Sequence, residues 1–268
     1  MQVSKDTFSR PKEHVARVID LVGKYPIDWK RASETVTFAE AEARNRHHRN
    51  GRFVGWPDNR KYNKHYNAFF GEGLGKFFGK TGPMTIGEAF ASVPRQKNRP
   101  FVLVEDGAGK GFGLSGAVRD LEKRGVPVHS VALAYNPHPT LLKRTAIGRI
   151  KEVSAGTAEA WVPRQKIDGL ISVFGSIHYT MPQARKDHLL KFATSLNKGG
   201  IMLVGFDEIY LHQPGLKDNE RFKANLVASF AKRGFRAEVH PLDRRNLPRI
   251  NGEDKAIPHN VLIVQRIK

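Results

Sequence analysis

The second half of the chain alternates short apolar runs with stretches whose apolar residues recur at helical spacing. The runs are rich in Val, Ile, Leu and Phe and have the length of buried strands. They cover residues 101–105, 126–135, 148–154, 168–177, 200–206, 235–242 and 260–267. Strands that alternate with helices in this way predict an open, mostly parallel α/β sheet with helices on both faces.

Helices are predicted in the stretches between these runs. The clearest carries Leu114, Ala117, Val118 and Leu121 on one face and ends at Gly125. The others are predicted at 140–146, from Thr180 to Gly199, and along the stripe of Phe222, Leu226 and Phe230 that stops at Gly234.

The N-terminal third of the chain follows a different pattern. Apolar residues at 15–22 share a helical face, and Thr37 with Glu40 forms a capping-box pair at the start of a strongly basic helix. Residues 50–82 are rich in Gly, Asn and aromatic side chains without a clean period, and predict loops with short helical pieces. We therefore expect a basic helical and loop extension at 1–98, acting as a lid or substrate lobe, and an α/β domain at 99–268.

The composition sets the class of protein. Apolar residues make up 40% of the chain and charged residues 26%, as in ordinary soluble proteins. No apolar run approaches the roughly 20 residues of a membrane span. The first residues lack the apolar core of a secretory signal, so we expect a cytoplasmic protein without a membrane partner. The absence of cysteine excludes disulfides, thiolate metal sites and a cysteine nucleophile.

The net charge of +19 is the most unusual global property of the chain. A surplus of this size favours a polyanionic partner such as nucleic acid, because binding releases the counterions of the phosphates. A general compositional bias toward basic residues is the alternative explanation.

A glycine-rich loop, EDGAGKGFGLS, follows the first strand of the predicted sheet at residues 105–115. A phosphate-binding P-loop is excluded, because Lys110 is followed by Gly111 rather than Ser or Thr. The dinucleotide pattern G-x-G-x-x-G fails in both registers, at Phe112 and at Leu114. The pattern [DE]-x-G-x-G-x-G fits in full with Glu105, Gly107, Gly109 and Gly111.

This loop resembles the first motif of the class I S-adenosylmethionine-dependent methyltransferases. The resemblance extends from Phe101 to the C-terminus with the elements in the family's order, including LLKFATSLNKGGIMLVGF, which is similar to the family's turn before its fifth strand. It implies a Rossmann-like seven-stranded sheet that closes with a C-terminal antiparallel hairpin. It also implies S-adenosyl-L-methionine as the cofactor and methyl transfer as the reaction.

The resemblance implies a set of cofactor-binding residues. Glu105 is expected to accept from the methionine ammonium, Thr157 and Ala158 to contact the adenine, and Phe174 with Gly175 to border the methyl group. The full set is Glu105, Asp106, Gly107, Ala108, Gly109, Tyr135, Asn136, Thr157, Ala158, Phe174 and Gly175. For the glycines, a tight turn that binds no ligand is the alternative.

One departure from the family concerns the ribose. The family normally ends its second strand with an Asp or Glu that binds both ribose hydroxyls, and this chain has Ala134 there. Asn136 is the nearest substitute, and Thr157 stands where an adenine-binding Asp is common. A copy of the fold that no longer methylates therefore remains an alternative.

The segment after the fourth strand offers the candidate catalytic residues. His178 is the candidate general base, since imidazole titrates near neutral pH, and Tyr179 is a candidate for holding the acceptor. The alternative is that His178 caps or packs beneath the following helix. Asp207 and Glu208 either line the acceptor cleft or are solvated loop acids.

A basic segment of the N-terminal extension points to RNA. Its cations alternate with the rings of Phe53, Trp56, Tyr62 and Tyr66, which suits phosphate contacts together with base stacking. The candidate nucleic-acid-binding residues are Arg44, Arg46, Arg49, Arg52, Trp56, Arg60, Lys61 and Lys64. A solvated basic helix, or a lid in which Tyr62 or Tyr66 covers the cofactor, is the alternative. His47, His48 and His65 lack partners for a metal site, and we expect no metal.

The sequence therefore predicts an S-adenosylmethionine-dependent methyltransferase that acts on RNA. A small-molecule methyltransferase is one alternative. A non-catalytic RNA- or ribonucleoprotein-binding protein that kept the fold is the other.

Overall fold

The computed structural model describes residues 62–95, 98–134, 139–155, 161–173, 175–176, 182–206, 219–242 and 260–268. Seven strands form one sheet in the order β3-β2-β1-β4-β5-β7-β6. The strands are β1 (Phe101–Asp106), β2 (Val128–Ala134), β3 (Glu152–Ala155), β4 (Ile167–Val173), β5 (Leu196–Phe206), β6 (Phe235–Pro241) and β7 (Asn260–Arg266).

The strand directions confirm the predicted fold. Strands β1 to β5 pair in parallel, whereas β7 lies antiparallel between β5 and β6. The strand order reverses between β1 and β4, which is the point where open α/β sheets bind their ligands. The protein therefore has a Rossmann-like sheet with a C-terminal antiparallel hairpin.

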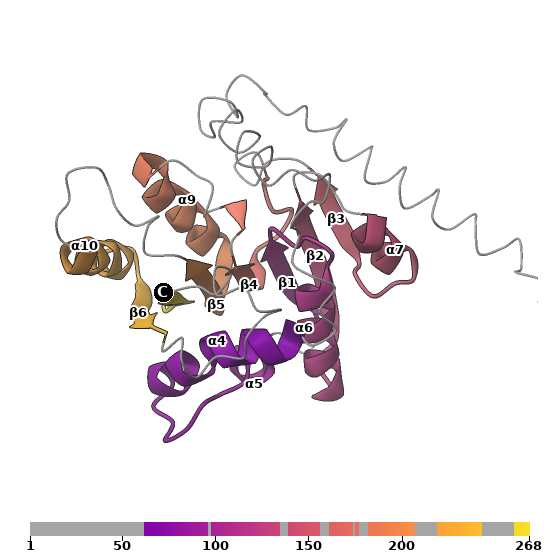
Figure 1. The fold of residues 1–268 in the computed structure, drawn as a ribbon, viewed down its shortest axis with the longest axis horizontal. Coiled ribbons are helices and arrows are strands. Elements are labelled where there is room, and N and C mark those ends of the chain that lie inside the picture. Colours follow the sequence, from indigo (N-terminus) through magenta and orange to yellow (C-terminus); the bar gives the residue numbers. More distant parts are fainter. Residues whose placement is uncertain are drawn as a thin grey trace, which may run out of the picture.

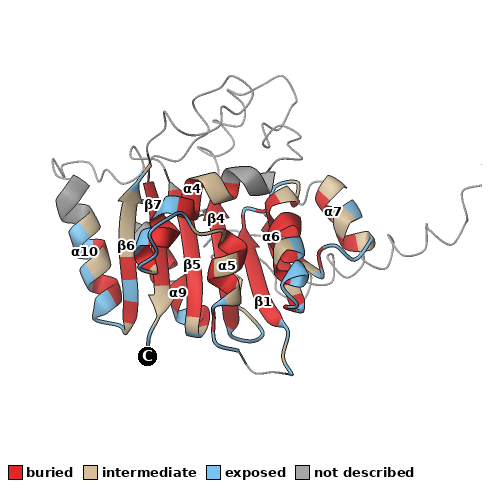
Figure 2. Ribbon diagram, turned by 90° about the horizontal axis from the view of Figure 1, so that it is seen from below, coloured by how far each residue is buried: buried red, intermediate tan, exposed pale blue. Residues whose placement is uncertain are grey.

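Helices cover both faces of this sheet (Figure 1). The helices are α4 (Tyr62–Phe77), α5 (Ile86–Ala91), α6 (Phe112–Lys123), α7 (Pro139–Ala146), α9 (Pro182–Ser195) and α10 (Asn219–Ala231). Helices α4, α5 and α6 lie on one face, and α9 and α10 on the other. Figure 2 shows the buried strands behind α4, α5 and α6. None of the described helices combines the length and the apolarity that a membrane crossing requires.

Two apolar clusters hold the layers together, one on each face of the sheet. Every residue of β1 is buried, and successive side chains point to opposite faces. Phe101 and Leu103 therefore join the cluster under α4, α5 and α6, while Val102 and Val104 join the cluster under α9 and α10. This two-sided burial explains why the strand reads as a continuous apolar run.

Helix α4 corrects the expectation of loops with short helical pieces at 50–82, because 16 residues of that segment form one continuous helix. Its buried residues Tyr66, Phe69, Phe70, Leu74 and Phe77 recur at helical spacing. The glycines between them suggested a loop, but they serve close packing. A Cβ on Gly75 would lie 2.1 Å from the carbonyl oxygen of Gly82, and the helix needs a bare backbone there.

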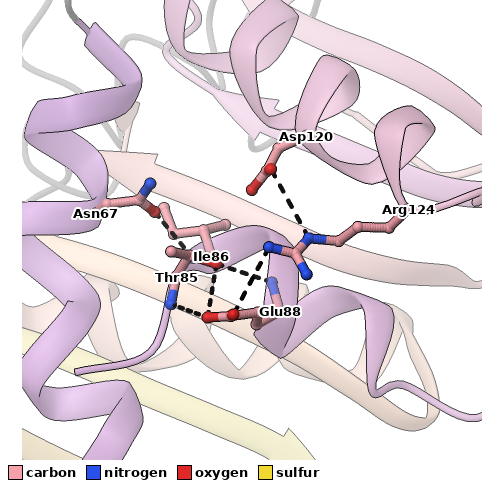
Figure 3. Close-up of polar contacts among 6 residues, drawn as sticks. All are labelled: Asn67, Thr85, Ile86, Glu88, Asp120 and Arg124. Carbon is pink, nitrogen blue, oxygen red and sulfur yellow. Dashed lines mark hydrogen bonds and ion pairs between the residues drawn. The ribbon is translucent and has the colours of Figure 1, made fainter. Parts of the chain in front are cut away.

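Polar contacts fix α5 between α4 and α6 (Figure 3). Thr85 and Glu88 form a reciprocal capping box, and Asn67 of α4 accepts from the amide of Ile86 at 2.9 Å. The hydrogen bonds from Thr85 hold the pKa of Glu88 below its usual range. Arg124, at the end of α6, pairs with Glu88 and Asp120 at 3.7 Å each. The described part of the extension is thus packed onto the sheet through both apolar and polar contacts.

Candidate functional site

The glycine loop, Gly107–Gly111, connects the end of β1 to the start of α6. Because β1, β2 and β4 are parallel, their carboxyl ends meet at the same edge of the sheet as this loop. The candidate site therefore lies at the reversal of strand order.

Gly107 joins the ends of three strands. Its φ of +72° is a left-handed conformation, and a Cβ on it would lie 2.5 Å from the Cα of Gly175, just after β4. The amides of Gly107 and Ala108 both donate to the carbonyl oxygen of Leu133 in β2 at 3.1 Å. The predicted residues Gly107, Ala108 and Gly175 are therefore in one place, and the backbones can approach only because both contact positions are glycine.

The tip of the loop is open. Gly109 has a φ of +50°, and an added Cβ would find nothing closer than 3.9 Å. Across the described ranges, the amides of Gly109 and Lys110 have no hydrogen-bond acceptor. Exposed amides at the N-terminal end of a helix suit an anionic group, because the helix dipole adds to their hydrogen bonds. A carboxylate such as that of methionine fits this part of the site.

Glu105 is almost fully buried, with 2% of its surface exposed. Its Oε1 accepts from the hydroxyl of Tyr66 at 2.6 Å, and its Oε2 accepts from the amide of Leu114 at 3.0 Å. Burial raises the pKa of Glu105 to about 7; the nearby Asp106 carboxyl acts in the same direction, and the two hydrogen bonds oppose it. Both carboxyl oxygens of Glu105 thus face protein donors from α4 and α6.

Asp106 points to the opposite face of the sheet from Glu105. It is 1% exposed, and its Oδ2 accepts from the hydroxyl of Ser172 in β4 at 2.7 Å. A Cβ on Gly175 would lie 2.4 Å from the carbonyl oxygen of Asp106 and 2.5 Å from Oδ2. Asp106, Ser172 and Gly175 therefore form one close-packed polar contact between the ends of β1 and β4.

Ala134 ends β2 as the sequence analysis expected, buried and paired with Ala155 of β3. The last residue of β2 therefore offers no carboxylate to a ligand. This confirms the departure from the pattern of the family that the sequence resembles. The other predicted residues here, Tyr135 and Asn136, lie outside the described residues.

Most of the remaining predicted site residues also lie outside the described residues. These are Thr157, Ala158, Phe174, His178 and Tyr179, together with Asp207 and Glu208 and with Arg44, Arg46, Arg49, Arg52, Trp56, Arg60 and Lys61. For Lys64 only the backbone is described, within α4. Their roles remain predictions. Within the described ranges, no three His, Asp or Glu side chains gather as a metal site.

Two residues of the site were missed or misread from sequence. Tyr66 was interpreted as a stacking ring or a lid, but it is 3% exposed and its hydroxyl is bonded to Glu105, so its ring is not available to a base. Gly113 was not singled out, yet a Cβ on it would lie 2.5 Å from both Glu105 and Tyr66. A fourth glycine two residues after Gly111 was the available signal for this close approach.

Comparison with known proteins gives structural likeness only. No protein-family model and no curated protein sequence matches this chain. A candidate class I S-adenosylmethionine-dependent methyltransferase from Listeria monocytogenes is 15% identical, with a TM-score of 0.47. The match covers 65% of this chain and 55% of that one, so this chain spans little more than half of the Listeria protein.

Two further solved structures are similar at the same level. A 1,6-didemethyltoxoflavin-N1-methyltransferase from Burkholderia thailandensis with bound S-adenosylhomocysteine is 16% identical over 67% of this chain and 77% of its own, with a TM-score of 0.45. An amino pentose methyltransferase from Micromonospora echinaspora with bound S-adenosylmethionine is 12% identical over 63% and 85%, with a TM-score of 0.41. At such identities and TM-scores, the likeness carries no conclusion about activity or substrate, which are argued below from the residues of this chain.

Proposed function

We propose that this chain binds S-adenosylmethionine at the glycine loop and transfers the methyl group to an acceptor. The observation that carries the proposal is the backbone contact between Gly107 and Gly175, which brings the ends of β1 and β4 together. The space beside Gly109 stays free for a ligand. When bound, the cofactor supplies a methyl group already activated by its sulfonium, so the protein's main task is positioning. The amides of Gly109 and Lys110 would hold the carboxylate, and Gly175 would border the reacting end.

Calorimetry with S-adenosylmethionine and S-adenosylhomocysteine tests this proposal. We expect the wild-type protein to bind both, and Gly107→Ala to weaken binding by at least about tenfold, because the loop must move away from β4. Gly125→Ala is the matched control: it has a similar φ of +71° but no atom within 4 Å of an added Cβ. Absence of wild-type binding at millimolar cofactor would contradict the proposed activity.

A second candidate function is favoured by Ala134. The missing ribose acceptor costs roughly 1–3 kcal/mol of cofactor binding on general grounds. A non-catalytic RNA-binding protein with the same fold is consistent with that loss. It predicts RNA binding without any heat of cofactor binding, and the same calorimetry therefore separates the two functions.

RNA is the acceptor that we propose for the methyl group. Its support is the net charge of +19 together with the basic segment of the extension. A further support lies in the described part, at the edge of the sheet formed by α7 and β3. Lys143, Arg149 and Lys151 are exposed there, and no described carboxylate pairs with them. A small-molecule acceptor has no need of such an edge.

RNA binding at different salt concentrations tests this finer proposal. We expect affinity to fall steeply with salt, since each phosphate contact releases counterions. Replacing Lys143, Arg149 and Lys151 by Gln should flatten the salt slope. The matched control replaces the exposed Lys186, Lys198 and Lys232 by Gln, which removes the same charge from other elements. A flat wild-type slope would instead favour a small-molecule substrate.

A further inference from the structure

Three segments far apart in sequence meet behind the glycine loop. Tyr66 comes from α4, Glu105 from the end of β1, and Leu114 from the first turn of α6. The hydroxyl of Tyr66 donates to one oxygen of Glu105 at 2.6 Å, and the amide of Leu114 donates to the other at 3.0 Å. The Glu105 carboxyl thus bridges the N-terminal extension and the helix that follows the loop.

The bridge replaces a missing helix cap. The N-cap residue of α6 is Gly111, with a φ of 73° and no side chain to accept a hydrogen bond from the first turn. The first amides of a helix need an acceptor, and here Glu105 supplies one from the preceding strand. A Cβ on Gly113 would lie 2.5 Å from Oε1 of Glu105, so the glycine makes room for the bridge. Glu105 therefore fixes the point where the loop becomes a helix.

Tyr66 in turn fixes Glu105. The ring is 3% exposed and packs edge-on against Phe70 with 6.4 Å between ring centroids. The groups that contact the Glu105 carboxyl are the Tyr66 hydroxyl from α4 and the Leu114 amide from α6, and the Asp106 carboxyl acts on it only through its charge, from the opposite face of the sheet. Because Tyr66 holds one oxygen in place, the other oxygen is directed at the α6 amide.

We propose that Tyr66 and Glu105 are positioning residues, which hold the glycine loop in its cofactor-binding form, and that Glu105 does not contact the cofactor itself. This inference rests on the proposed function. It differs from what the family resemblance implies, where Glu105 receives the methionine ammonium. In this chain the position of α4 is coupled to the glycine loop through the buried carboxyl of Glu105.

An analogue of S-adenosylhomocysteine that lacks only the α-amino group separates positioning from direct contact. We expect Glu105→Gln to weaken binding of S-adenosylhomocysteine and of the analogue by the same factor, about three- to tenfold. A penalty that disappears with the analogue would show that Glu105 binds the ammonium, and would overturn the proposal. The ratio compares two ligands on one variant, so a general loss of folding does not change it.

A double-mutant cycle tests the coupling between the two residues. Tyr66→Phe should weaken binding about as much as Glu105→Gln, and the double variant should be little worse than either. Between pH 6 and 8, wild-type affinity should rise as Glu105 ionises, since burial raises its pKa to about 7. Tyr66→Phe removes a hydrogen bond that favours the ionised form of Glu105, so the rise in affinity of this variant should occur at higher pH. Glu105→Gln should show no rise, and additive effects with unchanged pH profiles would overturn the proposal.

Hydrogen exchange in the ligand-free protein decides the inference independently of cofactor binding. Tyr66→Phe should lower the protection of the Leu114 amide, because Glu105 is no longer held in place. Ser229→Ala is the control, since it removes a buried hydroxyl that bonds within α10 at 2.7 Å. If Leu114 is equally protected in the wild type, in Tyr66→Phe and in Ser229→Ala, the positioning role is wrong. If wild-type protein binds no cofactor while Leu114 protection falls as expected, the proposed activity fails and the bridge stands.

Discussion

Gly107 and Gly175 pack backbone against backbone, so that a Cβ on Gly107 would lie only 2.5 Å from the Cα of Gly175. This contact joins the strand ends on either side of the reversal in strand order. Loop flexibility explains neither glycine. A side chain on Gly107 would collide with the backbone of Gly175, and one on Gly175 would collide with the backbone and the carboxyl of Asp106.

Gly175→Ala should destabilise the protein more than the substitution of an uncrowded glycine such as Gly82 or Gly125. An added Cβ would lie 2.4 Å from the carbonyl oxygen of Asp106 and 2.7 Å from the hydroxyl of Ser172. We expect a loss of about 1–3 kcal/mol in the free energy of unfolding from this overpacking. Urea denaturation measures the loss.

Two other glycines provide the comparison for Gly175→Ala. Gly125→Ala has backbone strain without a clash and should lose about 1 kcal/mol. Gly82→Ala has neither and should be neutral, or stabilise by about 0.5 kcal/mol through the unfolded chain. Equal effects at Gly175 and Gly82 would contradict the packing at the ends of β1 and β4.

Glu105 should give the protein a distinctive pH dependence. Its folded-state pKa of about 7 lies above the ordinary value of 4.5, so the folded state holds the proton more tightly than the unfolded chain. The resulting stabilisation is complete below the ordinary pKa and is lost as pH rises through the folded value. A change of about 3 kcal/mol is expected across that window.

Glu105→Gln isolates this contribution. Its amide can accept from Leu114 and donate to the oxygen of Tyr66, as the protonated acid can, but these neutral hydrogen bonds are weaker than those of the ionised carboxylate. The wild type should therefore lose stability relative to Glu105→Gln as pH rises from 4.5 to about 7, and the difference should be constant above that. Urea titrations at a series of pH values measure it. Parallel stability curves for the two proteins would show that folding does not raise the pKa of Glu105.

The fold was predictable because its signals are local. Buried parallel strands read as apolar runs, and the stripe from Leu114 to Leu121 identifies α6 without any tertiary information. Helix α4 was missed because its glycines lower helix propensity, and only packing shows their purpose. A Cβ on Gly73 would meet His240 and Ile263 at 3.2 Å, contacts that no local pattern reveals.

The site was predictable only where spacing encodes it. Gly107 and Gly109 follow from the motif, and their positive φ angles agree with it. The partners of Glu105 depend on side-chain direction. A strand alternates its faces, so Glu105 reaches α4 and α6, whereas Asp106, adjacent in sequence, reaches Ser172 of β4 on the other face. The 39 residues that separate Tyr66 from Glu105 hide the hydrogen bond between them from any sequence pattern.

Asp168 should be the most sensitive acidic residue at the opposite edge of the sheet. It is fully buried at the start of β4, and its carboxylate accepts from Arg99 at 2.5 Å, Asn197 at 2.6 Å and the amide of Val102 at 2.8 Å. Asp168→Ala leaves these donors without their acceptor, so we expect a loss of about 3 kcal/mol in unfolding free energy. Denaturant midpoints at neutral pH measure it.

The matched control for Asp168 is an acid in a weaker ion pair. Asp120 is partly exposed and lies 3.7 Å from Arg124, so Asp120→Ala should change stability by about 0.5 kcal/mol or less. Comparable losses for the two variants would mean that the Asp168 cluster adds no more than a surface pair.

Asn260 should be a position where a polar side chain lowers stability. It is fully buried at the start of β7, and within the part of the chain that the structure describes neither Nδ2 nor Oδ1 has a hydrogen-bond partner. Along β7 its side chain shares a face with Leu262 and Val264, which pack in the apolar cluster under α9 and α10. A buried amide without partners costs about 1–3 kcal/mol, so Asn260→Leu should raise the unfolding free energy by about that amount.

Asn197→Leu is the same chemical change at another position, and there we expect the unfolding free energy to fall. The Asn197 amide donates to Asp168 at 2.6 Å, and its loss leaves a buried carboxylate with one donor fewer. Thermal or urea unfolding of both variants therefore gives shifts of opposite sign if the two amides differ as the contacts indicate. A loss of stability in Asn260→Leu as large as that in Asn197→Leu would mean that the Asn260 amide is satisfied in solution, by water or by a group that the described contacts do not include.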